Sequence, residues 1–187
     1  MEKFQLLKEQ ILNCKKCSLW KTRNNPVVGE GNLNSRMMFI GEAPGFNEDK
    51  QGKPFVGAAG NIFNQLLNSI NLKKEEIYIT NILKCRPPEN RNPREEEINF
   101  CKDYLNKEIE LIKPKIICCL GNFATGFIMK KFNLDKELQG ISKIHGEVFE
   151  VSTLNGQVKI IPLYHPSVAT YNSNMLETLK KDFKKIK

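Results

Sequence analysis

The sequence predicts an α/β protein built on a mainly parallel sheet with helices on both faces. Short apolar runs that suit buried strands alternate with longer stretches whose apolar residues recur at helical spacing. Their order, β-α-β-α-β-α-β(-β)-α, is typical of a parallel sheet in which each helix returns the chain to the start of the next strand. No repeat, low-complexity tract or internal linker interrupts this order, so we expect one domain over residues 1–187.

The overall composition is that of a globular protein with an excess of positive charge. Of 187 residues, 40% are hydrophobic and 27% are charged, and 29 Lys and Arg stand against 21 Asp and Glu, giving a net charge of +8. Such a balance favours a polyanionic partner, with nucleic acid first. The alternative is that the lysines are spread evenly over the surface.

The first half of the chain contains two helices and two strands. Residues 3–13 and 58–70 have apolar side chains at helical spacing. The apolar run at 36–41 and the β-branched run at 77–81 predict the first two strands.

The second half continues the alternation after a segment, 85–93, that three prolines keep irregular. Asn92 and Pro93 make a good helix start, ahead of three glutamates that favour the positive end of a helix dipole. We expect a helix from there to 112, a buried strand at 115–120, a helix at 121–131, a hairpin within 144–164 with its turn at Asn155 and Gly156, and a Lys-rich helix from 174.

The loop after the first strand carries the most informative motif. Gly41, Pro44 and Gly45 end the apolar run abruptly, because glycine tolerates positive φ and proline restricts φ. The loop also brings three carboxylates to the carboxyl end of that strand: Glu42, Glu48 and Asp49. Ligands bind at this edge of open α/β sheets, although an ordinary strand-to-helix turn with solvated acids would look the same.

Segments after the other parallel strands should reach the same edge. Residues 81–85, 121 and 165–167 each follow a predicted strand, and the carboxyl ends of parallel strands meet at one edge. His165 therefore stands where a substrate would lie. His145 has no such position, and we interpret it as structural or peripheral.

Four of the six cysteines have a spacing that can hold a metal. Cys14 and Cys17 lie in one short segment, whereas Cys85 and Cys101 come from a loop and a helix. Such a set can close a four-ligand site for zinc or for an iron–sulfur cluster, and spacing alone slightly favours zinc. The alternative is unrelated thiols, as we expect for the core cysteines at 118–119.

We expect a cytoplasmic protein without membrane contact. No apolar signal core follows the first residues, and the longest run of aliphatic and cysteine residues, 116–120, is far too short to span a bilayer. In that compartment the cysteines are expected as thiols or metal ligands rather than disulfides.

Several short motifs together resemble those of the family 4 uracil-DNA glycosylases, the iron–sulfur branch of the uracil-DNA glycosylase superfamily. The resemblance covers about residues 5 to 185, and the combination is highly specific although no single motif is. The matching motifs are Gly41-Glu-Ala-Pro-Gly45, Glu48-Asp49, Gly52-Lys-Pro-Phe-Val-Gly57, Thr80-Asn81, Lys84-Cys-Arg-Pro-Pro88, Asn90-Arg91, Pro93 and His165-Pro-Ser167.

The resemblance implies a three-layer α/β/α domain with a central, mainly parallel sheet of four strands. It also implies a [4Fe-4S] cluster on Cys14, Cys17, Cys85 and Cys101, which favours iron–sulfur over zinc, and no nucleotide cofactor. In the family this cluster is regarded as structural. It would tie the N-terminal segment and the 85–93 loop to the helix that bears Cys101.

The same resemblance assigns the substrate contacts. Phe55 would stack on a uracil flipped out of the duplex, and Asn81 would hydrogen-bond its N3–H and O4. His165 would donate to O2 as the glycosidic bond breaks and negative charge develops on the departing base. The opening loop would complete the base contacts through Glu42, Ala43 and Pro44.

The group that positions the attacking water stays open. The best-known uracil-DNA glycosylases place an Asp in the opening loop, where this sequence has Ala43, as is usual in family 4. Glu42, Glu48 and Asp49 are candidates for holding the water, and Glu48 is also a candidate for excluding a thymine methyl group. We therefore rank stabilisation of the leaving base above base catalysis.

Candidate DNA contacts lie in two loops. Arg86 and Arg91 follow the second strand, and Ser167 and Tyr171 follow the last one. The family often carries an Arg near position 171, so Tyr171 removes a phosphate contact, although its ring can stack or wedge. The Lys-rich tail at 180–187 is a further candidate, with a solvated helix face as the equal alternative.

The resemblance predicts a monofunctional glycosylase that acts as a monomer, removes uracil from single- or double-stranded DNA and starts base-excision repair. A second hypothesis is a non-enzymatic iron–sulfur module that binds nucleic acid or accompanies a polymerase. A third is a sister glycosylase with a wider base preference. A pure binding module would not need the set Phe55, Asn81 and His165, which favours an enzyme.

Overall fold

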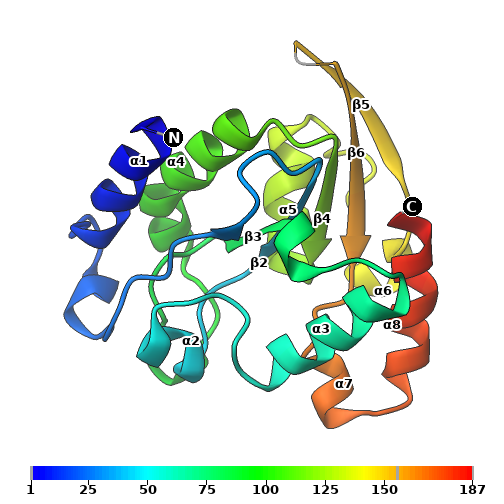
Figure 1. The fold of residues 1–187 in the computed structure, drawn as a ribbon, viewed down its shortest axis with the longest axis horizontal. Helices are drawn as coiled ribbons and strands as arrows, with labels where there is room; N and C mark the ends of the chain where they lie inside the picture. Colours follow the sequence, from blue (N-terminus) through cyan, green and yellow to red (C-terminus); the bar gives the residue numbers. More distant parts are fainter. Residues whose placement is uncertain (1, 155, 187) are drawn as a thin grey trace.

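The computed structural model describes residues 2–154 and 156–186, and its six described strands form one mixed sheet flanked by helices (Figure 1). The strands lie in the order β1-β3-β2-β4-β6-β5. Their bounds are β1 Glu30–Gly31, β2 Met37–Gly41, β3 Tyr78–Asn81, β4 Ile116–Leu120, β5 Phe149–Thr153 and β6 Gly156–Leu163.

The sheet is mixed and has six described strands, so the expected number of four strands is wrong. The inner strands β3, β2, β4 and β6 run parallel, but the edge strands β1 and β5 pair antiparallel with β3 and β6. Strand β1 is two residues long, too short to leave a periodic signal in the sequence. Strand β5 is the first arm of the predicted hairpin, which extends beyond the helices at the top of Figure 1. The predicted turn residue Asn155 lies outside the described residues.

The helices follow the strands in the expected alternation, with short additions. They are α1 Glu2–Leu12, α2 Phe46–Gln51, α3 Ala58–Ser69, α4 Glu95–Ile112, α5 Asn122–Lys131, α6 Ile141–Ile144, α7 Val168–Tyr171 and α8 Met175–Phe183, with 3₁₀ turns at Ser18–Lys21, Lys74–Glu76, Pro88–Asn90 and Lys184–Ile186. Among the described helices, none combines the length and apolar character needed to cross a membrane.

Each face of the sheet packs against its own helices. On one face Phe39 of β2 contacts Phe63 of α3 and stacks on Phe183 of α8. Its neighbour Met38 points to the other face, into a cluster with Leu105 of α4 and residues of α5. Because both faces are buried, the central strands β2 and β4 are apolar throughout, and the sheet lies between two helical layers.

Helix α1 lies beside α4 at the flank of the sheet (Figure 1). A third apolar cluster joins the two helices. It contains Leu7 and Ile11 of α1 and Tyr104 of α4, and it also takes in Cys85 and Cys101. The amphipathic N-terminal helix therefore packs where the candidate ligand cysteines gather.

The opening loop contains a helix that the sequence did not predict. Gly45 stands in extended conformation just before α2, and Gly52 ends the helix in the left-handed region at φ 68°. Six residues are too few to show helical periodicity. This helix carries Glu48 and Asp49 and decides where their carboxylates point.

Candidate active site

A cavity of about 560 Å³ opens at the carboxyl ends of the parallel strands. Its wall includes a residue that follows or ends each of them: Glu42 after β2, Asn81 at the end of β3, Gly121 after β4 and His165 after β6. This volume suits a small organic ligand. The expected convergence of these loops at one edge of the sheet is confirmed.

Glu48 of α2 lines the cavity and holds the loop opposite. Its Oε1 accepts hydrogen bonds from the backbone N–H groups of Val56 (2.9 Å) and Gly57 (2.7 Å). The preceding residue, Phe55, has φ 53°, a left-handed conformation that is rare outside glycine. Such a conformation persists only when neighbouring contacts enforce it, and Glu48 supplies two of them.

The three expected base-contacting side chains meet inside this cavity. The centroid of the Phe55 ring lies 5.9 Å from that of His165, with 35° between the ring planes. A Cβ on Gly41 would come within 2.3 Å of Asn81 Oδ1 and 2.9 Å of Phe55 Cζ. Glycine at the end of β2 therefore lets Phe55 and Asn81 both approach the strand.

Asn81 presents a free amide to the cavity from a rigid position. The residue is 4% exposed, and its backbone carbonyl accepts a hydrogen bond of 2.8 Å from Lys84 Nζ. Within the described part of the chain, its side-chain amide makes no hydrogen bond, although it lines the cavity. Its donor and acceptor are therefore available to a ligand.

The hydrogen bonds of His165 determine which ring nitrogen carries the proton. The backbone N–H of Ser167 donates to His165 Nδ1 at 3.2 Å, and Ser167 Oγ lies 2.8 Å from the same atom. Because a backbone N–H can only donate, Nδ1 is an acceptor and the proton of the neutral ring sits on Nε2. Burial lowers the pKa of His165 to about 4, against the opposing effect of Glu48. At neutral pH the ring is therefore a neutral donor through Nε2.

The opening loop contributes part of its length to the cavity. Glu42 and Ala43 line it, and burial raises the pKa of the Glu42 carboxyl. Pro44 is buried and is not among the residues of the cavity wall. The structure thus brings Glu42 and Ala43, but not Pro44, to the other expected ligand contacts.

The Asp49 carboxylate faces away from the cavity. It accepts hydrogen bonds from the backbone N–H of Asn24 (2.9 Å), from the Asn24 side chain and from the backbone N–H of Asn25 (3.3 Å). It is 1% exposed and is absent from the cavity wall. Of the three candidate carboxylates, only Glu42 and Glu48 are placed to hold a water there.

The two arginines expected at DNA differ in their surroundings. Arg86 lies over the ring of Phe46, 5.2 Å from its centroid, and donates to Asn90 at 2.7 Å beside the cavity. Arg91 instead forms a two-pronged ion pair with Glu97 of α4. Its charge is therefore paired with Glu97 in the first turn of α4.

The residues after the last strand divide between the cavity and the surface. Ser167 lines the cavity and binds His165. Tyr171, at the end of α7, is 92% exposed. Farther along, Lys180 of the basic tail pairs with Glu177 at 2.8 Å.

The four candidate ligand cysteines share the apolar cluster between α1 and α4. Cys85 and Cys101 are buried, Cys14 and Cys17 are half-buried, and all are free thiols. No three His, Cys, Asp or Glu side chains of the described residues lie close enough to surround one metal ion. The four thiols nevertheless lie in one region, the apolar cluster between α1 and α4.

N–H donors reach two of these sulfurs, and the sequence did not indicate either donor. Arg23 Nη1 donates to Cys85 Sγ at 2.9 Å, while Nη2 donates to the Cys14 carbonyl at 3.0 Å. The backbone N–H of Lys84 donates to Cys101 Sγ at 3.3 Å. Such donors are typical of the surroundings of thiolate ligands. The only signal in the sequence is that Lys84 directly precedes the candidate ligand Cys85, which places its backbone N–H near the cysteine site.

Comparisons with known proteins identify the family of the chain. The family model of the uracil DNA glycosylase superfamily matches residues 28–187. The chain is 47% identical to the Type-4 uracil-DNA glycosylase of Archaeoglobus fulgidus, over 100% of this chain and 92% of that protein. It is 44% identical to the Type-4 uracil-DNA glycosylases of Sulfurisphaera tokodaii and Saccharolobus solfataricus, over 100% of this chain and 84% and 86% of theirs. The chain therefore belongs to the uracil-DNA glycosylase superfamily, and within it to the Type-4 uracil-DNA glycosylases.

Proposed function

We propose that this chain hydrolyses the N-glycosidic bond of uracil in DNA and leaves an abasic site, the first step of base-excision repair. The similarity to named Type-4 uracil-DNA glycosylases over the whole chain supports this activity. The observation that carries it is the meeting of Phe55, Asn81 and His165 in one cavity, a set that a pure binding module would not need.

Base recognition starts with a uracil that has left the stack. The target atom of a duplex is out of reach until the base flips into a pocket. Phe55 stacks on the flipped ring. The Asn81 amide accepts from uracil N3–H and donates to O4, whereas cytosine presents the opposite pattern and would leave buried polar groups unpaired. The free Asn81 amide supports this role.

His165 stabilises the departing base. Its Nε2–H donates to uracil O2, where negative charge develops as the bond to C1′ breaks and the sugar becomes oxocarbenium-like. A neutral donor suits this task at neutral pH, and the low pKa of His165, about 4, supports it. A preplaced donor of this kind is worth roughly 3–4 kcal/mol of barrier.

Water attack needs positioning more than a strong base. Glu42 and Glu48 border the cavity, and Ala43 offers no side-chain base. One oxygen of Glu48 is used by Val56 and Gly57, so its other oxygen is the one that can hold the water or exclude a thymine methyl group. Neither Asp49 nor Pro44 is part of this proposal, because neither borders the cavity.

We assign Cys14, Cys17, Cys85 and Cys101 as the ligands of a [4Fe-4S] cluster. Four thiols in one apolar region and the N–H donors on two sulfurs fit this group, in which each sulfur binds its own iron and need not converge on one ion. When bound, such a cluster would cross-link α1, the loop at Cys85 and α4. No step of base removal uses it.

DNA contacts are proposed on the rim of the cavity. Ser167 borders it, and Arg86 donates to Asn90 of its wall. The exposed ring of Tyr171 is placed to stack on or wedge between bases. Arg91 contributes less, because Glu97 holds its charge. We further propose a single domain that acts as a monomer in the cytoplasm on single- or double-stranded DNA.

The test uses oligonucleotides with one uracil, single-stranded and paired, followed by detection of alkali-labile abasic sites. The wild-type protein should produce them, and His165→Ala should lower the single-turnover rate by about 10²–10³-fold. Lys159→Met, at an exposed residue of β6, is the control and should match the wild type. Clean, folded protein that leaves deoxyuridine intact would refute the proposal.

A further inference from the structure

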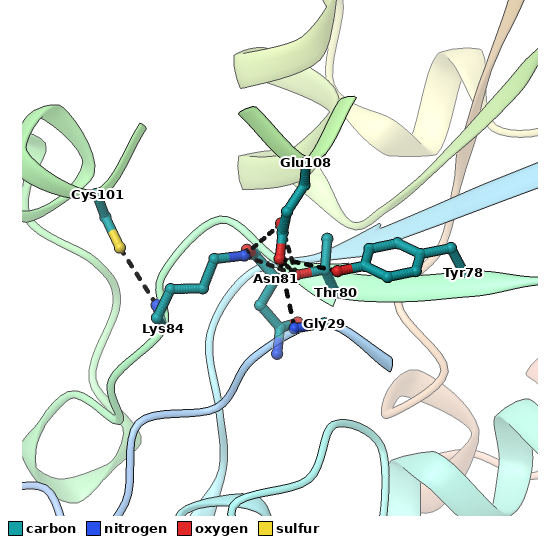
Figure 2. Close-up of polar contacts among 7 residues, drawn as sticks. All are labelled: Gly29, Tyr78, Thr80, Asn81, Lys84, Cys101 and Glu108. Carbon is teal, nitrogen blue, oxygen red and sulfur yellow. Dashed lines mark hydrogen bonds and ion pairs between the residues drawn. The ribbon is translucent and has the colours of Figure 1, made fainter. Parts of the chain in front are cut away.

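A buried ion pair, Lys84 with Glu108, contacts the backbone of Asn81 (Figure 2). Lys84 Nζ and Glu108 Oε2 are 2.7 Å apart, and their side chains are 2% and 0% exposed. Lys84 comes from the loop after β3, whereas Glu108 comes from the C-terminal half of α4. Neither residue borders the cavity, so neither touches a ligand bound there.

The Glu108 carboxylate collects hydrogen bonds from the strand that carries Asn81. The Thr80 hydroxyl lies 3.0 Å from Oε2, and the Tyr78 hydroxyl donates to Oε1 at 3.1 Å. The backbone N–H of Gly29 reaches the same oxygen at 3.4 Å. Helix α4 thus holds residues of β3 through one carboxylate whose two oxygens both accept hydrogen bonds (Figure 2).

Lys84 uses all three ammonium donors in the same place. Besides Glu108, its Nζ donates to Thr80 Oγ1 at 2.6 Å and to the Asn81 carbonyl at 2.8 Å. Its backbone N–H meanwhile reaches the sulfur of Cys101. One residue therefore contacts both the backbone of Asn81 and a candidate cluster ligand.

Stability alone does not explain this pair. Taking two charges out of water costs free energy that their attraction repays only in part, and apolar replacements of buried ion pairs are often neutral or stabilising. The Asn81 amide makes no hydrogen bond among the described residues, so its direction depends on its backbone. That backbone is what the ammonium of Lys84 holds.

We propose that Lys84 and Glu108 are positioning residues that orient the Asn81 amide and thereby set the preference for uracil over cytosine. This inference rests on the proposed function. It assigns a role in base selection to a pair that lies outside the cavity.

The experiment neutralises both charges together in the cluster-containing protein. Lys84→Met/Glu108→Gln removes both charges, so neither is left buried without a partner. The glutamine oxygen still accepts hydrogen bonds from the Tyr78 and Thr80 hydroxyls, so few buried donors lose their acceptor. The matched control is Lys159→Met/Glu150→Gln, the same change at an exposed pair. Thermal midpoint, visible absorbance, single-turnover rates on uracil and cytosine, and binding to an abasic oligonucleotide are measured for each.

Positioning predicts a folded variant whose uracil excision falls roughly tenfold to a hundredfold. Its abasic-site binding should stay unchanged, and its ratio of uracil to cytosine excision should fall. In an Asn81→Ala background the same neutralisation should cost nothing further, because the two changes act on one contact. The exposed control should match the wild type in every measurement.

Three outcomes would overturn the inference. One is a lower melting temperature with an unchanged rate and base ratio, which marks a merely structural pair. Another is that the double substitution lowers the rate of uracil excision as much in the Asn81→Ala background as in the wild-type background. The third is an Asn81→Ala protein as active as the wild type. A wild-type protein inactive on uracil would instead remove the proposed function and this inference together.

Thr80→Val carries the same test if the double variant does not fold. It keeps both charges and the side-chain volume but removes the hydroxyl between Lys84 and Glu108. A several-fold loss that disappears in the Asn81→Ala background supports the inference, and an unchanged rate overturns it.

Discussion

The guanidinium Nη1 of Arg23 lies 2.9 Å from the sulfur of Cys85, and the two residues that follow Arg23 hold helix α2. These residues, 24–25, donate to the Asp49 carboxylate. Glu48 of the same helix holds the loop across the cavity. A continuous set of contacts therefore joins the cysteine site to the candidate active site.

Removing the Arg23 guanidinium should loosen the cysteine site. In Arg23→Gln the Cys85 sulfur and the Cys14 carbonyl lose a charged donor, so the iron–sulfur absorbance should decay several-fold faster in air or with a chelator. Arg36→Gln, at an exposed residue, is the control. Identical decay in both variants would show that Arg23 does not support the ligands.

Asp49 is expected to position α2 rather than to act on water. Asp49→Asn places two amide donors face to face at Asn24 and should lower the excision rate by about tenfold. The exchange Asn24→Asp/Asp49→Asn restores a donor–acceptor pair and should recover most of the rate. If Asp49 were the catalytic base, the exchange would stay as inactive as the single variant.

Gly41 should tolerate no side chain, because the space above it belongs to the base contacts. In Gly41→Ala the new Cβ would lie 2.3 Å from Asn81 Oδ1 and 2.9 Å from Phe55 Cζ. We expect a folded protein with excision reduced at least about tenfold. Gly126→Ala, which meets nothing within 4 Å, should behave like the wild type. Uracil kinetics of both variants test this directly.

Asn81→Asp should change which base is removed. A carboxylate cannot donate to uracil O4 but can accept from the cytosine amino group, so uracil excision should fall by at least roughly tenfold and cytosine excision should become measurable. Oligonucleotides that carry either base give the two rates. An unchanged base preference would show that Asn81 does not contact the base edge.

The low pKa of His165 links stability to pH. Because its pKa of about 4 in the folded chain lies below the ordinary value near 6.5, the unfolded chain binds the extra proton between these values. Its contribution is complete above about pH 6.5 and is lost as pH falls toward 4, by about 2 kcal/mol between pH 7 and 5. Denaturation of the wild type and of His165→Gln at both pH values measures it. The variant should lose less stability over that range, and equal losses would contradict the assignment.

Local patterns in the sequence were enough to predict most of the helices and strands and much of the candidate active site. Apolar periodicity predicted α3, the helix-start residues at 92–93 predicted α4, and uniform apolarity predicted β4, each to within about three residues at each end. The rule that parallel strands end at one edge predicted that Asn81 and His165 would meet. Strand β1 and helix α2 were missed because a few residues leave no periodic signal and form only against the elements already folded.

The sequence by itself determined the alternation of strands and helices, the edge at which ligands gather and the thiols that come together, because each depends on residue type and spacing along the chain. The tertiary structure alone decided that Asp49 turns to Asn24, that Arg23 reaches Cys85 and that Lys84 and Glu108 close behind Asn81. Those contacts join residues distant in sequence through long side chains. Their geometry is set by packing between elements, which no local pattern encodes.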